Sequence, residues 1–318
     1  MYNNIPLSDS SIFIVGSPRS GTTLLQAFLS TQSPIYSFRE THFFTKIKPE
    51  LIIDVTGHIE EMCLTNVYEL LHSILDLQFT EEERSSISLS ARDHKLTPRM
   101  LFEIIIRKLI AEQHGIVANT AIWLEKTPDH ALHLGEIYEW YPSARVIHIV
   151  RHPIPVIYSM NNNFKFLVEK SVRELAKRWL MTIETVDSYS ERYNIFTVRY
   201  EDLVADVNKV VRGICDYLKI DFDPGALSQY AKKAKIITSS SETWKNDVQK
   251  PIIVNSNLVA MKKCSLSSKM LIYVITRSKS MKYGYFSNMP LVNIAYSLWT
   301  TAAPARLRTG INNMLKGN

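Results

Sequence analysis

Short apolar runs alternate along the chain with longer stretches in which apolar residues recur at helical spacing. The runs are rich in β-branched residues and three to six residues long, as expected for strands buried in a parallel sheet. They cover residues 12–15, 35–38, 122–124, 145–150 and 195–199. Strands that alternate with helices predict an α/β domain, with a mostly parallel sheet covered by helices on both faces.

Further helical patterns are concentrated in residues 45–118. Two of them, at 59–75 and 98–112, flank the acidic run 81–83, which we place at a helix start or in a loop. A helical insertion of this length commonly builds the walls of a substrate site, but its sequence does not name the substrate. Beyond it, a long amphipathic helix is predicted at 171–192.

The first apolar run is followed by a loop between two glycines, and the loop opens a helix. It reads Gly16-Ser17-Pro18-Arg19-Ser20-Gly21-Thr22-Thr23. This spacing matches G-x-x-x-x-G-K-[ST] at each defined position except the lysine, where Thr22 stands. At a helix start, unpaired backbone N–H groups and the helix dipole attract an anion, and the loop hydroxyls add donors. The pattern predicts a phosphate-binding loop, with an ordinary turn as the plain alternative.

The missing lysine changes the expected chemistry. Enzymes that hydrolyse nucleoside triphosphates use this lysine on the β- and γ-phosphates and the next hydroxyl on Mg²⁺. Here the positive charge is Arg19 instead, and the run 145–150 ends in Arg151 where a metal-binding Asp would stand. Both departures favour a different phosphate-bearing donor. A P-loop nucleotide kinase and a non-catalytic nucleotide-binding module remain the alternatives.

A second anion site is predicted at the end of the run 145–150. Arg151 follows this strand directly, and Ser159 lies eight residues further on. Pro153 or Pro155 can open the helix between them, so both side chains could face one ligand. Two separate anion sites on one sheet suit a nucleotide that carries phosphate at both ends of its ribose.

Both anion motifs resemble those of the sulfotransferases that use 3′-phosphoadenosine 5′-phosphosulfate (PAPS). The 5′-phosphosulfate loop of that family is similar to residues 17–23, and its 3′-phosphate motif to residues 151–159. Two further segments resemble the branch that contains tyrosylprotein, heparan sulfate and many bacterial sulfotransferases, and residues 198–203 match another feature of the family. The two segments are Glu40-Thr41-His42-Phe43-Phe44 and Glu125-Lys126-Thr127-Pro128. The resemblance covers about residues 11–285 and implies a P-loop-type α/β fold in a single domain with helical insertions.

The resemblance implies a transferase that moves a sulfuryl group from PAPS to a hydroxyl or an amine, without a required metal. Such a reaction needs a base for the acceptor proton and cations over the transferring oxygens. Glu40 is the expected base, and Arg19 and Lys126 are the expected cations. His42 would orient Glu40 or serve as an alternative base. The acceptor would be a glycan, a lipid or a small metabolite.

Each of these residues also has a plainer interpretation. Glu40 could be a surface carboxylate beside Arg39. Lys126 could form a surface pair with its neighbour Glu125. His42 could be a structural histidine among aromatic residues.

The donor-binding residues implied by the resemblance come from several separate segments. They are Ser17, Pro18, Arg19, Ser20, Gly21, Thr22, Thr23, Arg151, Ser159, Tyr200, Lys245 and Lys250. Tyr200 either stacks on adenine, as in tyrosylprotein sulfotransferases, or belongs to the core. Lys245 and Lys250 lie where the sequence loosely matches the loop over the cofactor, and either could meet the 3′-phosphate or the phosphosulfate.

Cysteine usage and the N-terminal sequence bear on where the protein works. Cys63, Cys215 and Cys264 are widely scattered and lack metal-ligand spacing, so we expect free thiols. The N-terminus has no basic segment followed by an apolar one, and no stretch approaches the ~18 continuous apolar residues of a membrane span. If the chain is complete, a cytoplasmic and bacterial enzyme is the natural interpretation.

Positive charge is concentrated towards the C-terminus. The chain has a net charge of +6, and after Asp247 it contains ten Lys or Arg residues and no acidic residue. We expect residues 1–287 to form the catalytic domain and 288–318 a basic helical extension. This extension would either contact an anionic membrane surface peripherally or dock on the domain as an ordinary terminal helix. Nucleic acid is not an expected partner, because no groove-reading or base-stacking motif accompanies the charge.

Overall fold

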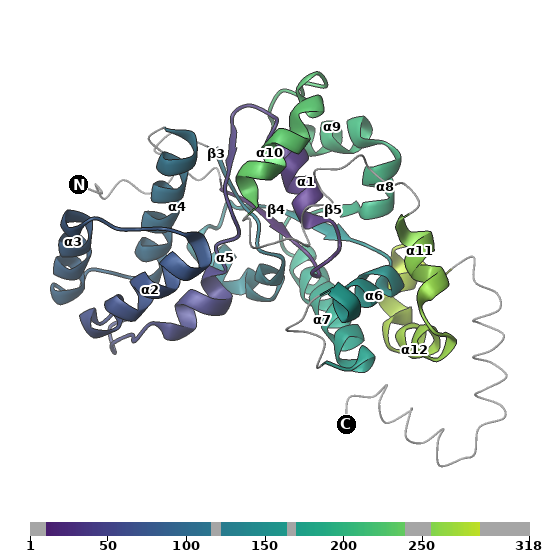
Figure 1. Cartoon of the computed structure of the whole chain (residues 1–318), viewed down its shortest axis with the longest axis horizontal. Helices are drawn as coiled ribbons and strands as arrows, with labels where there is room; N and C mark the ends of the chain where they lie inside the picture. The colour runs from purple at the N-terminus through teal and green to yellow at the C-terminus, as the bar shows by residue number, and fades with distance from the viewer. Residues whose placement is uncertain (1–10, 116–121, 164–169, 239–255, 287–318) are drawn as a thin grey trace, which may run out of the picture.

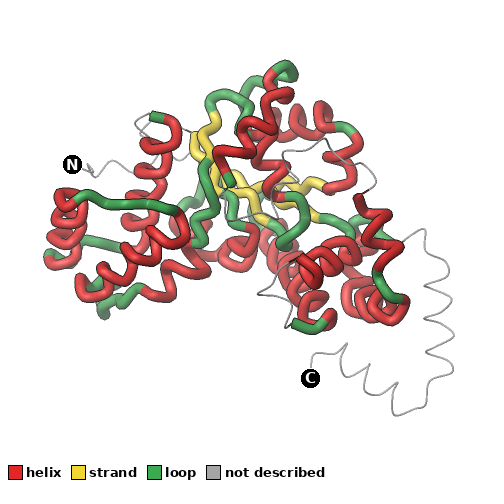
Figure 2. Tube along the Cα trace, in the orientation of Figure 1, coloured by secondary structure: helices red, strands yellow, loops and turns green. Residues whose placement is uncertain are grey.

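The computed structural model describes residues 11–115, 122–163, 170–238 and 256–286. Its centre is a five-stranded sheet in the order β2-β3-β1-β4-β5, shown in yellow in Figure 2, and every neighbouring pair is parallel. The strands are β1 (Ser11–Val15), β2 (Ile35–Ser37), β3 (Ile122–Glu125), β4 (Arg145–Val150) and β5 (Phe196–Arg199). The predicted α/β fold with a parallel sheet is therefore confirmed.

The central strands have continuous apolar sequences because both of their faces are covered. Phe13 and Val15 of β1 pack with Trp123 of β3 on one face of the sheet. Ile12 and Ile14 pack on the opposite face, against helix α1 (Thr22–Leu29) and helix α9 (Val207–Leu218). A strand that is buried on both faces loses the apolar-polar alternation of a half-exposed strand.

The predicted insertion forms a helical lobe beside this sheet, on the left in Figure 1. Its helices are α2 (Leu64–Leu75), α3 (Glu81–Arg92) and α4 (Pro98–His114). The acidic run opens α3, where Thr80 forms a capping box with Glu83. Helix α2 begins later than the pattern at 59–75 predicts, because Ile59 instead pairs with Ile53 in an isolated bridge.

A second group of helices packs beyond the other end of the sheet. It consists of α6 (Pro153–Asn163), α7 (Val172–Ser190), α11 (Ser256–Lys263) and α12 (Leu266–Lys282). Helix α7 matches the predicted amphipathic helix and is capped by Ser171 and Glu174. The Asp187 carboxylate of α7 accepts hydrogen bonds from Lys279 and Lys282, which tie it to α12.

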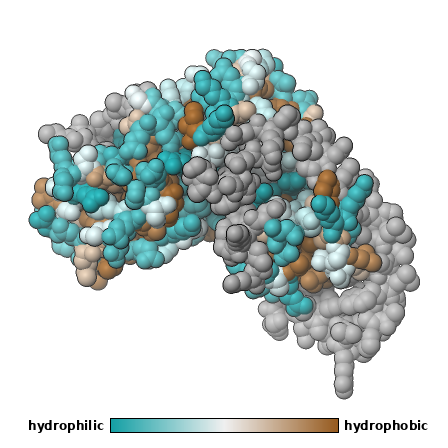
Figure 3. Space-filling view, in the orientation of Figure 1, coloured by the Kyte–Doolittle hydropathy of each residue, from teal (hydrophilic) through white to brown (hydrophobic). Residues whose placement is uncertain are grey.

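Smaller helices complete the domain. They are α5 (Leu134–Trp140), α8 (Tyr200–Ala205) and α10 (Tyr230–Ile237). The face of the molecule seen in Figure 3 is mainly hydrophilic over the described helices, as expected for helices that cover an apolar sheet. All three cysteines are free thiols, as predicted, and the structure shows that all three are buried. Within the described residues, no helix is both long enough and apolar enough to cross a bilayer.

Candidate active site

The loop between β1 and α1 has the geometry of an anion cradle. Helix α1 begins at Thr22, so the loop leads directly into a helix N-terminus, as predicted. The backbone N–H of Ser20 donates to the carbonyl of Ser17 over 3.1 Å, which closes a tight turn. The hydroxyls of Ser17 and Ser20 are buried and have no hydrogen-bond partner among the residues that the structure describes. Such hydroxyls, beside free N–H groups of a helix start, fit a phosphate or sulfate oxygen.

Gly21 is required by both its conformation and its surroundings. Its φ of +96° lies in the left-handed region, where a side chain is strained. A Cβ atom at this position would also lie 2.5 Å from the ring of Tyr200. The tyrosine ring therefore packs directly on the loop and helps to fix its shape.

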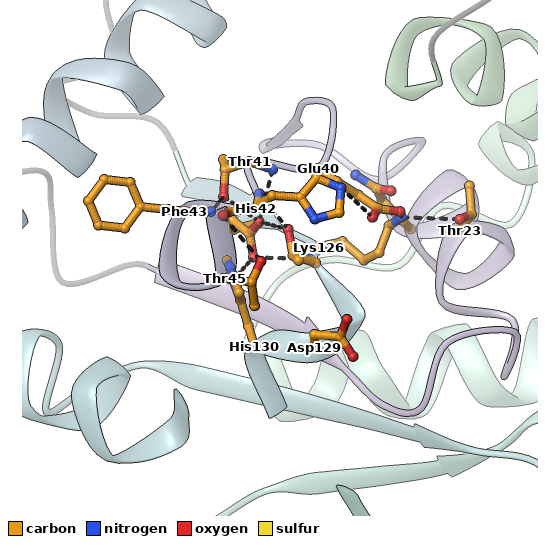
Figure 4. A network of polar contacts seen from close by, with 12 residues as sticks. Thr23, Glu40, Thr41, His42, Phe43, Thr45, Lys126, Asp129 and His130 are labelled. Atoms are coloured by element: carbon orange, nitrogen blue, oxygen red, sulfur yellow. Dashed lines mark hydrogen bonds and ion pairs between the residues drawn. The ribbon is translucent and has the colours of Figure 1, made fainter. Parts of the chain in front are cut away.

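Glu40 and Lys126 meet at the carboxyl edge of the sheet, just beyond β2 and β3. The Lys126 ammonium forms an ion pair with the Glu40 carboxylate and donates to the Thr23 hydroxyl over 3.1 Å. His42 Nε2 lies 3.4 Å from a Glu40 oxygen. Figure 4 shows the end of the Lys126 side chain between Glu40 and Thr23, which lies at the start of α1, and the His42 ring beside Glu40. Three of the residues expected to carry the chemistry are thus adjacent to the anion cradle.

The burial of this pair excludes the plainer interpretations of its two members. The Lys126 side chain has no exposed surface, and that of Glu40 is 10% exposed. Lys126 pairs with Glu40 and not with Glu125, and Glu40 is not a surface carboxylate beside Arg39. A buried ion pair offsets its desolvation cost only where its geometry is good and further hydrogen bonds satisfy the charged groups, as the Thr23 hydroxyl does for Lys126.

A second polar group lies around Arg19. Arg19 Nε donates to the Ser159 hydroxyl over 2.9 Å, and Arg151 Nη1 donates to the Arg19 carbonyl over 3.3 Å. The structure therefore brings Arg151 and Ser159 to one place, as the sequence predicts, and it adds Arg19 to them. Arg19 contacts the residues expected to bind the 3′-phosphate, so its expected position over the sulfuryl group stays a prediction.

Arg151 is also held from two other sides. Its guanidinium carbon lies 4.0 Å from the centre of the Tyr200 ring, and its Nε donates to Asn257 of α11 over 2.9 Å. Burial lowers the pKa of Arg151. The position of Tyr200 between the loop and Arg151 is consistent with a packing role, and its contact with adenine stays a prediction.

Glu201 links the C-terminal helices to this group. Its carboxylate accepts hydrogen bonds from the His152 backbone N–H at 3.1 Å, from Asn257 at 2.8 Å and from the Tyr285 hydroxyl at 2.8 Å. Burial and the nearby Arg151 lower the pKa of His152 to about 3, so its ring is neutral at pH 7. Asn257 and Tyr285 were missed by the sequence analysis, because single polar residues in a poorly matched region carry no motif.

Next to Lys126 in the chain is a buried carboxylate, Glu125, that the sequence analysis did not assign to the site. Glu125, the last residue of β3, accepts hydrogen bonds from Thr41, Thr127 and His130. Burial by itself raises the pKa of Glu125, but the charge of His130 and the hydroxyl donors outweigh it, and the pKa lies below its usual value. In the sequence, a charged residue at the end of a buried apolar strand was the feature that could have pointed to Glu125.

The predicted donor-binding residues Lys245 and Lys250 lie outside the described residues.

Comparison with known proteins identifies the family. The family model described as "Sulfotransferase family" matches residues 11–224, which is more than half of the chain. The chain belongs to this family. The sulfotransferase is thus an enzyme, and its five-stranded parallel sheet agrees with that assignment.

Two solved structures share the fold of this sulfotransferase. The sulfotransferase domain from the curacin biosynthetic pathway is 20% identical, with 85% of this chain and 96% of that chain covered and a TM-score of 0.56. The sulfotransferase domain from the Synechococcus PCC 7002 olefin synthase is 21% identical, with coverages of 79% and 93% and a TM-score of 0.50. A protein of Aquifex aeolicus (strain VF5) described as uncharacterized is 25% identical over 242 residues. That alignment covers 73% of this chain but only 28% of the Aquifex protein.

Proposed function

We propose that this sulfotransferase uses PAPS as its donor and transfers the sulfuryl group to a hydroxyl or amine, with Glu40 as the general base. The observation that supports the proposal is the contact of the Lys126 ammonium with both Glu40 and Thr23. It joins a base, a cation and the start of helix α1 in one place. Sulfuryl transfer needs these three elements together.

The donor would be held at both of its ends. The loop residues 17–23 would bind the 5′ end, where the buried hydroxyls of Ser17 and Ser20 offer donors that no other group in the described part of the chain engages. Arg151 and Ser159, together with Arg19, would bind the 3′-phosphate. A bidentate guanidinium suits a phosphate, because its N–H groups match two phosphate oxygens.

Within this arrangement each side chain has a defined task. The donor supplies the sulfuryl group and the leaving 5′-phosphate. The Glu40 carboxylate takes the proton of the acceptor O–H or N–H, and the Lys126 ammonium offsets negative charge on the transferring oxygens. His42, at 3.4 Å, would orient the Glu40 carboxylate. Lys126 beside Glu40 keeps the carboxylate ionised before the acceptor arrives.

The acceptor would be bound against the helical insertion at 45–118. This segment follows Glu40 almost directly in the chain, and its helices α2, α3 and α4 form a lobe beside the sheet. A glycan, a lipid or a small metabolite is the expected acceptor class. Peripheral membrane contact through 288–318 stays a prediction, because those residues lie outside the described part of the chain.

A ligand panel followed by a transfer assay tests this function. In thermal unfolding, adenosine 3′,5′-bisphosphate should raise the melting temperature, while ATP with Mg²⁺ and GTP with Mg²⁺ should raise it less. Incubation with ³⁵S-labelled PAPS and fractionated extracts should then yield a labelled acceptor. Stronger stabilisation by ATP with Mg²⁺ would favour a P-loop kinase. Binding of the bisphosphate without any transfer would favour a non-catalytic nucleotide-binding module.

A further inference from the structure

The Glu125 carboxylate joins the two chain segments that carry Glu40 and Lys126. Its side chain has no exposed surface. One oxygen, Oε1, accepts from the hydroxyls of Thr41 at 2.9 Å and Thr127 at 2.7 Å. The other, Oε2, accepts from the backbone N–H of Thr127 at 3.1 Å and from His130 Nδ1 at 2.9 Å. Thr41 follows Glu40 in the chain and Thr127 follows Lys126, so one carboxylate binds the neighbours of both.

The two threonines extend the network to the next residues. The Thr127 hydroxyl accepts from the His42 backbone N–H over 3.2 Å, and the Thr41 hydroxyl accepts from the Phe43 backbone N–H over 3.3 Å. Figure 4 shows this network beside the Glu40–Lys126 pair. The residues that follow Glu40 and Lys126 in the chain are therefore both hydrogen-bonded to the buried Glu125 carboxylate.

We propose that Glu125 and Thr127 are positioning residues, which hold the side chains of Glu40 and Lys126 in place beside the start of helix α1. The inference rests on the proposed role of Glu40 as the base. Glu125 takes no part in the chemistry, and it acts through the backbone of residues 41 and 127.

Position 125 needs a carboxylate because the polar groups that contact it are all hydrogen-bond donors. Thr41, Thr127 and His130 all direct N–H or O–H groups at the two oxygens. A glutamine would replace one acceptor oxygen by an NH₂ group, which would face these donors and leave them unsatisfied. A residue that only filled space here would be apolar, since a buried carboxylate is costly unless its hydrogen bonds are complete. We therefore attribute to this network the positions of the backbone at residues 41 and 127.

This geometry matters for the reaction because a base acts only within hydrogen-bond reach of its proton. Displacement of a reacting group by ~1 Å can lower a rate by about 100-fold. Thr41 and Thr127 are each one residue away from a side chain of the pair, so a shift of their backbone is passed on directly. Loss of the network should lower turnover while the donor-binding groups around Arg151 remain in place.

The first test is independent of the acceptor and follows the accessibility of Lys126. Trace acetylation with acetic anhydride, read by mass spectrometry, is compared for the unchanged protein, Thr127→Val and Thr127→Ser. Valine keeps the shape of threonine and removes the hydroxyl, whereas serine keeps the hydroxyl. Lys108 is the internal control, because it is 11% exposed and is paired with Glu83 in the helical lobe. Glu125→Gln and Thr41→Val are treated in the same way.

We expect the labelling of Lys126 to rise severalfold in Thr127→Val and Glu125→Gln, to return towards normal in Thr127→Ser, and to stay unchanged at Lys108. Unchanged labelling of Lys126 in the three variants that break the network would overturn the proposal. A parallel rise at Lys126 and Lys108 would also overturn it, because it would indicate that the network only stabilises the fold.

The second test is a double-mutant cycle in the labelled-donor assay. Thr127→Val should reduce turnover by about 100-fold with unchanged affinity for adenosine 3′,5′-bisphosphate. Combined with Glu40→Gln, it should add little further loss, because both changes disable the same base. Fully additive losses would overturn the positioning role. If Glu40→Gln alone keeps normal turnover, the proposed base is wrong, and the labelling experiment still decides whether the network positions Lys126.

Discussion

At the scale of single residues, the ion pair of Glu40 and Lys126 sets what the site can do. The buried Lys126 ammonium contacts the Glu40 carboxylate and the Thr23 hydroxyl, so it can respond to charge on either side. When negative oxygens occupy the loop, the ammonium is shared between them and Glu40. In the proposed reaction, the carboxylate would then be less strongly neutralised and would be a better proton acceptor.

The variant Glu40→Gln tests this residue directly. Glutamine keeps the length of the side chain, and its carbonyl oxygen can still accept from Lys126, but it cannot take a proton. We expect turnover to fall by about two to four orders of magnitude, with unchanged affinity for adenosine 3′,5′-bisphosphate. Transfer assays and calorimetric titration measure the two quantities. Near-normal turnover would move the role of base to His42 or to another residue.

Gly21 offers a second test at this scale. In Gly21→Ala the new Cβ would lie 2.5 Å from the Tyr200 ring, so the loop or the ring must move. We expect at least a tenfold loss of affinity for the bisphosphate, which corresponds to about 1.4 kcal/mol. Gly57→Ala is the matched control, since Gly57 also has a positive φ, +86°, but its added Cβ meets nothing within 4 Å. Equal affinities of the two variants would show that the shape of the loop does not matter.

At the scale of elements, the sequence predicts what depends on local pattern. The five strands, the loop leading into α1 and the amphipathic helix α7 lie where apolar spacing and capping residues place them. The start of α2 was predicted too early, because a bridge between Ile53 and Ile59 takes part of the apolar pattern. The hydrogen bonds of Glu125 and the link between Glu201 and Asn257 could not be predicted, since they join residues that only the fold brings together.

Strand β4 makes stability depend on pH. His148 is fully buried in this strand, neither ring nitrogen has a hydrogen-bond partner in the described residues, and burial lowers its pKa to about 4. Asp187 raises this pKa and Lys282 lowers it, but burial dominates. The unfolded chain, with an ordinary histidine pKa of 6.5, therefore binds more protons between pH 6.5 and pH 4, and stability falls as pH falls through this window.

The variant His148→Leu should reduce this dependence. From the two pKa values, protonation of His148 in the unfolded chain costs the native state about 2 kcal/mol at pH 5 relative to pH 8. Urea unfolding at both pH values should show a smaller difference for His148→Leu, while His152 preserves part of it. Replacement of the exposed His72 by Gln is the control for the loss of a histidine at the surface. If both variants behave as the unchanged protein does, His148 is not the group responsible.

At the scale of the whole molecule, the candidate donor site is assembled from distant parts of the chain. Arg19 comes from the loop after β1, Arg151 from the end of β4, Ser159 from α6 and Asn257 from α11. Glu201 then connects Asn257 and Tyr285 to the same group. A ligand that contacts all of these residues links the sheet to the C-terminal helices. Its binding energy therefore adds to the stability of the whole domain.

A comparison of two arginines on one strand tests this assembly. Arg151 follows the end of β4, and Arg145 begins the same strand at the opposite edge of the sheet, with its guanidinium 5.5 Å from the centre of the Tyr217 ring. In thermal unfolding, adenosine 3′,5′-bisphosphate should stabilise the unchanged protein more than 5′-AMP does, because only the bisphosphate carries the 3′-phosphate. Arg151→Ala should remove most of this difference, since a charge-assisted contact is worth roughly 1.5–3 kcal/mol. Arg145→Ala should keep it. Equal stabilisation of the unchanged protein by both nucleotides would mean that Arg19, Arg151 and Ser159 form no 3′-phosphate site.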